Sequence, residues 1–120
     1  MKVIEQNNVV VIYQNRVTTS EDCINNLIGA MNYHSLDSCC AFEPNYYRAH
    51  GLFECNLLYE LSEKGIELNS FCIAMKKEVF NKVSNFDIQS KNFTEQYRTY
   101  IASEKLKHGL ICNAIIYAAP

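Results

Sequence analysis

Six cysteines and three histidines are the residues of this chain with the widest capacity for chemistry. His34 precedes Cys39 by five positions. His50 precedes Cys55 by the same interval. Two such pairs could offer a zinc ion two thiolates and two imidazoles. However, a step of five residues points the two side chains of a pair in different directions on a helix, and no C-x2-C pair occurs. We therefore expect mostly reduced, buried cysteines, no bound metal and no cofactor.

A cysteine nucleophile with a histidine base is the second chemistry that these residues allow. Cys39 and Cys40 are adjacent and would supply the thiol. The base would be His34, His50 or His108. Such a site needs a thiolate within hydrogen-bond reach of the imidazole and a third group that orients the base. No family signature surrounds the two cysteines, so a small Cys/His enzyme is an alternative hypothesis and not the leading one.

Glu54 and Glu104 could each have a role in catalysis or a structural role near the end of a helix. Glu104 and His108 are four residues apart in a predicted helix, where a carboxylate can fix the tautomer of a general base. The same spacing is common on solvated helix faces, and the helix dipole favours a histidine at a C-terminus. Glu54 could be a perturbed buried carboxylate, but a glutamate early in a helix more commonly caps free N–H groups. We expect structural roles for all three residues.

The apolar pattern predicts three strands and three or four helices that would position these side chains. The predicted strands cover 8–14, 66–75 and 110–119. The predicted helices cover 21–34, 51–64 and 92–109, with a shorter helix at 76–83. On the first helix, Cys23, Leu27 and Met31 fall on one stripe that should face the core. Leu27 and Ile115 are both expected inside.

The segment 36–49 has no clean period and is predicted to be an ordered loop of unusual length. It contains an aromatic pair, Tyr46 and Tyr47, next to Glu43 and Pro44. Loops of this length without structure of their own are uncommon and tend to be functional. A binding surface is therefore expected on this loop and on the helix that follows it.

These elements indicate an α+β or mixed α/β fold, in which a small three-stranded sheet packs with three to four helices. Residues 1–120 should form a single globular domain, because 48% hydrophobic and 12% aromatic residues are enough for one packed core. No apolar stretch has the length of a secretory leader or of a membrane-spanning helix. We therefore expect a cytoplasmic protein.

Charge is segregated along the chain. Residues 37–67 hold six acidic and two basic residues, whereas residues 76–107 hold seven basic and four acidic residues. Such asymmetry bears on partners and association rates. None of the four glycines stands in a phosphate-binding arrangement, and a sequence pI near 5.9 is low for a nucleic-acid-binding domain. We expect neither a nucleic acid nor a membrane as partner.

The acidic segment leads to the functional hypothesis of a non-enzymatic inhibitor that binds and occludes a macromolecular partner, of the toxin-immunity or antitoxin type. A phage counter-defence inhibitor is an alternative within the same class. The partner should be a protein with a basic surface, which acidic residues would attract and aromatic anchors would hold. The predicted partner-binding residues are Asp37, Glu43, Tyr46, Tyr47, Arg48, Glu60, Glu63 and Glu67.

Overall fold

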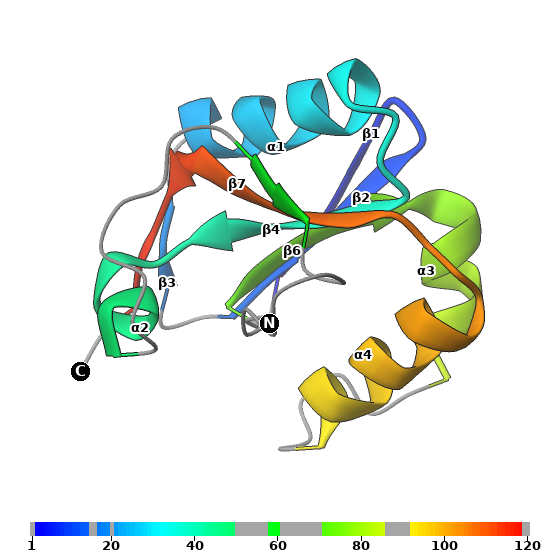
Figure 1. Cartoon of the computed structure of the whole chain (residues 1–120). Coiled ribbons are helices and arrows are strands. Elements are labelled where there is room, and N and C mark those ends of the chain that lie inside the picture. Colours follow the sequence, from blue (N-terminus) through cyan, green and yellow to red (C-terminus); the bar gives the residue numbers. More distant parts are fainter. Residues whose placement is uncertain are drawn as a thin grey trace.

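Strands from both ends and from the middle of the chain form one mixed six-stranded sheet (Figure 1). The computed structural model describes residues 2–14, 17–19, 21–49, 58–60, 71–85 and 92–118. Across the sheet, the order is β1 (Lys2–Gln6), β2 (Val9–Tyr13), β6 (Cys72–Lys76), β4 (Ser38–Phe42), β7 (His108–Ile115) and β5 (Leu58–Glu60). β4 and β7 run parallel, and the other neighbours run antiparallel. A separate antiparallel pair joins β3 (Val17–Thr18) to β8 (Tyr117–Ala118).

The prediction of a small three-stranded sheet is wrong, because the sheet contains strands where none is predicted. The predicted loop 36–49 contains β4, which lies between β6 and β7. Four of its five residues are buried, so both faces are covered and the strand shows no apolar alternation. β1 is an edge strand whose polar residues are equally typical of a loop. β5 falls inside the predicted helix 51–64, where the leucines fit a helical period as well.

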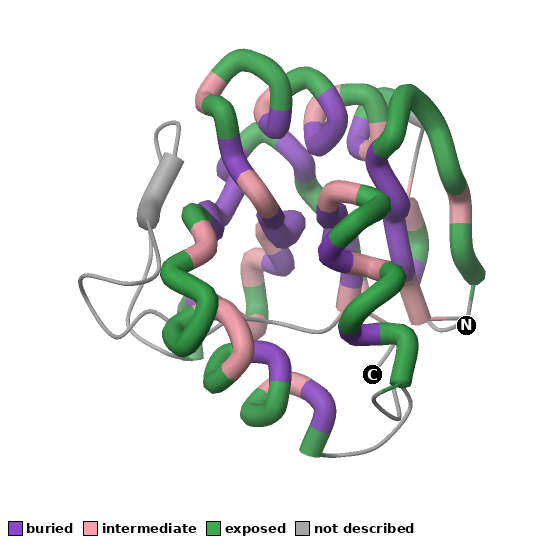
Figure 2. The backbone as a smooth tube through the Cα atoms, turned by 90° about the vertical axis from the view of Figure 1, so that its right-hand side faces the viewer, coloured by how far each residue is buried: buried purple, intermediate pink, exposed green. Residues whose placement is uncertain are grey.

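Helices cover both faces of the sheet and make a three-layer α+β fold. α1 (Glu21–Tyr33) lies on one face, and α3 (Lys77–Val83) and α4 (Phe93–Ser103) lie on the other (Figure 1). The short α2 (Pro44–Ala49) follows β4 and packs on the same face as α3 and α4. Two buried clusters result, one under α1 and one under the other three helices, and Figure 2 shows this burial between the layers.

The prediction for the first strand and the first helix is confirmed. β2 lies within the predicted strand 8–14, because its run of β-branched residues fits a central strand with both faces covered. α1 buries the predicted stripe, including Leu27, which is fully buried. α3 and β6 also lie in or next to their predicted segments. Ile115, in contrast, is 44% exposed, so its predicted burial is wrong.

The fourth helix ends earlier than the sequence predicts. Gly109 is the predicted stop, but α4 ends at Ser103 and Gly109 already lies in β7. Lys105 adopts a left-handed conformation with φ of 54°, and the backbone N–H of Leu106 donates to the carbonyl of Ile101. This is the hydrogen-bonding pattern of a left-handed helix stop, which glycine usually makes.

Candidate functional site

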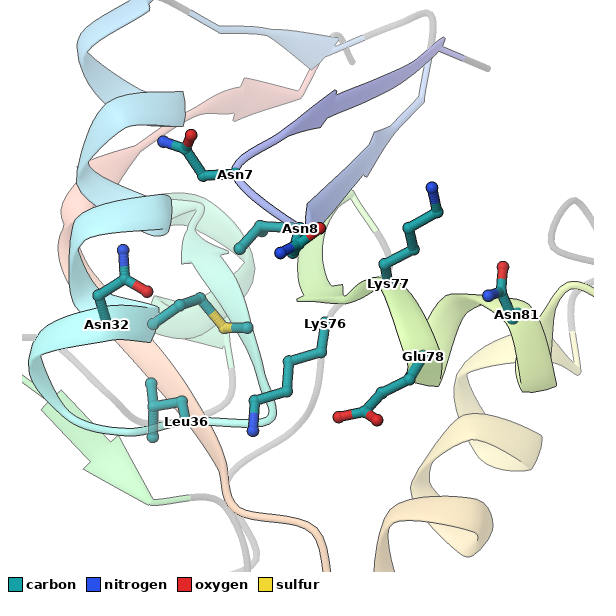
Figure 3. Close-up of a pocket in the computed structure, with 10 residues that line it drawn as sticks. Asn7, Asn8, Asn32, Leu36, Lys76, Lys77, Glu78 and Asn81 are labelled. Atoms are coloured by element: carbon teal, nitrogen blue, oxygen red, sulfur yellow. The ribbon is translucent and has the colours of Figure 1, made fainter.

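A polar groove of about 580 Å³ is the candidate functional site (Figure 3). It lies where the β1–β2 turn, the C-terminal end of α1 and the β6–α3 junction meet. Its floor is apolar and is formed by the buried residues Val9, Met31 and Leu36. Its rim is polar and is formed by Asn7, Asn8, Asn32, Lys76, Lys77, Glu78 and Asn81. An apolar floor with convergent polar groups is the usual composition of a binding site.

Backbone geometry fixes the walls of this groove. Asn7 and Asn8 form a two-residue hairpin turn with positive φ values of 54° and 63°. Asparagine tolerates this conformation better than most residues, and the turn suits the twist of two antiparallel strands. The backbone N–H of Lys77 donates to the carbonyl of Asn8 over 2.9 Å. This bond holds the start of α3 against the turn.

Both rim lysines are already paired with carboxylates. The Nζ of Lys76 lies 3.0 Å from Asp37, and the Nζ of Lys77 lies 2.8 Å from Glu5. Figure 3 shows the two lysine side chains extending in opposite directions. Partial burial acts to raise the pKa of Asp37, but hydrogen bonds from the Lys107 backbone and from Lys76 lower it overall. The groove therefore combines cations and anions and has no strong net charge.

The four rim asparagines leave their carboxamides available to a ligand. No hydrogen bond joins the side chain of Asn7, Asn8, Asn32 or Asn81 to any other residue in the part of the chain that the structure describes. Each carboxamide offers two donors and one acceptor oxygen. A peptide backbone carries the same kinds of group, so these side chains could bind an uncharged polar segment of another protein.

An exposed aromatic residue stands beside the groove. Tyr33 follows Asn32 at the end of α1 and is 85% exposed, the highest value among the exposed large hydrophobic residues described. Its ring meets the ring of His34 edge-to-face, with centroids 4.9 Å apart. Large exposed tyrosines are frequent anchors in protein interfaces.

The predicted partner-binding residues do not gather on one exposed face in the described part of the chain. Asp37 is tied to Lys76, whereas Arg48 is exposed at the end of α2. Glu43 is only 2% exposed, and its carboxylate accepts hydrogen bonds from the backbone N–H groups of Asn45, Tyr46 and Ala118.

The aromatic pair is also part of the interior. Tyr47 is fully buried, stacks on Phe42 and has no surface for a partner in this conformation. Tyr46 is half-buried and packs edge-to-face on Phe71.

The remaining predicted residues are not among those that the structure describes. These are Glu63, Glu67 and the side chain of Glu60.

The predicted nucleophiles are core residues. Cys39 and Cys40 are fully buried on opposite faces of β4. The thiol of Cys39 lies 3.8 Å from the carbonyl of Leu27, and that of Cys40 lies 3.6 Å from the hydroxyl of Tyr47. Burial raises the pKa of Cys39 well above its usual value. The described residues contain no group of three or more potential metal ligands. His50, Glu54 and Cys55 lie outside these residues.

Glu104 and His108 do not share a helix, since α4 ends at Ser103 and His108 begins β7. His108 is 4% exposed, and its Nδ1 lies 2.7 Å from the hydroxyl of Ser38. That hydroxyl also hydrogen-bonds to the hydroxyl of Tyr97. Sequence reasoning missed this buried network, because Ser38 and His108 are brought together only by the parallel pairing of β4 with β7.

The other ring nitrogen of His108, Nε2, is buried and has no hydrogen-bond partner among the described residues. Burial lowers the pKa of His108 from 6.5 to about 3, so the ring is neutral at physiological pH. His108 is almost fully buried, so the network is a structural feature of the core.

Among the described residues, no helix has the length and apolar character needed to cross a bilayer. Comparison of the chain with protein-family models, with curated proteins and with solved structures finds no match.

Proposed function

We propose that this chain is a non-enzymatic, cytoplasmic protein-binding domain that occludes a macromolecular partner, as toxin-immunity proteins and antitoxins do. The polar groove receives an uncharged polar segment of that partner. Tyr33 anchors the contact beside the groove.

The observation that carries this proposal is the set of four carboxamides around an apolar floor. The carboxamides come from three places that are distant in sequence, namely the β1–β2 turn, α1 and α3. Each can donate to a peptide carbonyl and accept from a peptide N–H. The floor formed by Val9, Met31 and Leu36 gives a small apolar side chain of the segment a place to pack.

The alternative of a Cys/His enzyme is weakened by where the candidate groups lie. Cys39 and Cys40 are fully buried and hydrogen-bonded in the core, and His108 is buried against Ser38. A nucleophile must reach a substrate and needs a base at hydrogen-bond distance. The thiol of Cys39 instead contacts the backbone carbonyl of Leu27, and the thiol of Cys40 contacts the hydroxyl of Tyr47.

The acidic residues Glu60, Glu63 and Glu67 would add long-range attraction to a basic partner surface. This expectation comes from the sequence alone, in which residues 37–67 include six acidic and two basic residues. Steering of this kind changes association rates and falls with salt, whereas groove contacts change dissociation rates.

Two matched asparagine-to-arginine substitutions test the groove. Asn32 lines the groove, while Asn25 is exposed two helical turns earlier on the same side of α1 and does not line it. The tagged wild-type chain is used to capture a partner from its native host, and the partner is identified and purified. We expect Asn32→Arg to weaken binding of this partner by at least about tenfold, while Asn25→Arg leaves it unchanged.

Equal binding by both variants and the wild type would contradict the proposed groove. Circular dichroism of both variants checks that each remains folded.

A further inference from the structure

β1 forms an edge of the sheet that no described strand extends (Figure 1). It pairs with β2 on one side, and the register of this pair is regular over all five residues of β1. An edge strand presents a row of backbone N–H and C=O groups, and many proteins protect such an edge with a proline or a β-bulge. β1 has neither of these features. The edge is therefore a surface to which another strand can be added.

One hydrogen bond on the far side of β2 identifies the backbone groups of β1 that point outward. The N–H of Lys77 donates to the carbonyl of Asn8, so the even-numbered residues along β2 direct their backbone groups toward β6. The odd-numbered residues of β2 therefore pair with β1, and their partners in β1 are its even-numbered residues. The N–H and C=O groups of Val3 and Glu5 point away from β2 as a result.

Both charged side chains of β1 have partners within the same chain. Glu5 lies 2.8 Å from the Nζ of Lys77, and the Nζ of Lys2 lies 5.9 Å from the centroid of the Tyr13 ring. Val3 is 49% exposed. In the part of the chain that the structure describes, no hydrogen bond reaches the outward backbone groups of Val3 and Glu5. The edge thus offers unpaired backbone groups and an apolar side chain.

We propose that β1 pairs antiparallel with β1 of a second copy of this chain, so that the two sheets join across a two-fold axis at Ile4. In this register, Val3 of each copy lies opposite Glu5 of the other. These are the residues whose backbone groups point outward, so each opposite pair exchanges both N–H···O=C bonds. The two Ile4 residues face each other as a non-hydrogen-bonded pair, with Cα atoms about 4.5 Å apart.

The sequence of β1 is complementary to itself in this register. Lys2 lies opposite Gln6, whose amide oxygen can accept a hydrogen bond from the ammonium group. A register centred on Glu5 would place two carboxylates directly opposite each other, which is unfavourable. A register centred on Val3 would leave Glu5 and Gln6 without opposite residues in β1. This self-complementarity favours a second copy over an unrelated strand as the occupant of the edge.

The oligomeric state of the full chain tests the proposal. β1 supplies five residues to the contact, compared with roughly 20–30 residues a side in a standard interface, so association should depend on concentration. In sedimentation velocity between about 1 and 100 µM, we expect the mass to rise from 13.8 kDa toward twice that value. A wild type that stays at 13.8 kDa throughout would overturn the proposal and leave the edge to a strand of another protein.

Two substitutions of Val3 test the backbone pairing. Val3→Pro removes one outward N–H, and proline is tolerated in an edge strand where the N–H faces solvent. Val3→Thr is the matched control, because it keeps the N–H and the β-branched shape. We expect Val3→Pro to remain at the mass of one chain over the same concentration range and Val3→Thr to dimerise. Equal dimerisation by both variants would contradict the proposal. Circular dichroism checks that both are folded.

Cysteine cross-linking tests the register. In Ile4→Cys, the two introduced thiols face each other across the axis at a Cα separation that suits a disulfide. In Val3→Cys they are diagonal neighbours, roughly 7–8 Å apart, which is too far. Mild oxidation should therefore give a covalent dimer on a non-reducing gel for Ile4→Cys and not for Val3→Cys. Equal cross-linking of both, or none of Ile4→Cys, would overturn the register. Asn32→Arg should dimerise as the wild type does, so failure here is separate from failure of the proposed groove.

Discussion

Protonation of His108 should destabilise the fold in mild acid. His108 is enclosed between β4 and α4, with Ser38 on its Nδ1 and the Tyr97 ring edge-on at 6.0 Å between centroids. In the part of the chain that the structure describes, its Nε2 has no hydrogen-bond partner, so a proton added there would place an uncompensated charge in the core. Burying such a charge is strongly unfavourable.

The magnitude follows from the difference between the folded and unfolded states. The pKa of His108 falls from 6.5 to about 3 on folding, because burial disfavours the charged form. The contribution to stability is therefore complete above about pH 6.5 and is lost progressively as the pH falls. Because pH 5 lies about 1.5 units below the unfolded pKa, the free energy of unfolding at pH 5 should be lower by about 2 kcal/mol. Asp37 acts in a different range, since its lowered pKa affects stability only below its ordinary value of 3.8.

Urea unfolding at pH 7 and pH 5 measures this loss. In His108→Asn the amide can keep the hydrogen bond to Ser38 but cannot titrate, so the difference between the two pH values should shrink by about 2 kcal/mol. His34→Asn is the matched control, because His34 is only half-buried at the end of α1. If His108→Asn and the wild type lose equal stability between pH 7 and pH 5, the argument from burial is refuted.

Four single substitutions have predicted effects on stability that urea unfolding can check. Leu27→Ala should cost about 2–5 kcal/mol because Leu27 is fully buried, whereas Ile115→Ala should cost under about 1 kcal/mol because Ile115 is 44% exposed. Lys105→Gly should stabilise by about 0.5–1 kcal/mol, because glycine adopts the left-handed φ of 54° without strain. Glu43→Ala should cost at least about 2 kcal/mol, because it removes the buried carboxylate that accepts a hydrogen bond from the backbone N–H at the start of α2.

Elements with a strong local signal could be predicted from the sequence. β2 has a run of β-branched residues, and α1 repeats apolar residues at helical spacing after suitable capping residues. β4 has neither signal, because its small residues Cys39, Cys40 and Ala41 are buried on both faces by neighbours that the local sequence does not specify. Missing this central strand led to the wrong sheet.

The groove could not be predicted for a different reason. Its residues come from 7–9, 31–36 and 76–81, which meet only because β2 pairs with β6 and α1 ends above them. Exposed asparagines carry no signal of their own, since they are ordinary surface residues. Among the described residues of the predicted partner-binding site, Glu43 and Tyr47 have structural roles, since one caps α2 and the other fills the core.

Photo-crosslinking from inside the groove tests the central claim most directly. A photoreactive amino acid replaces Asn32 in one variant and Asn25 in the other, and both are irradiated in the native host. The proposal predicts a covalent adduct with one specific protein from position 32 and none from position 25. Adducts from position 25 alone, or no adduct from position 32, would contradict a partner-binding groove.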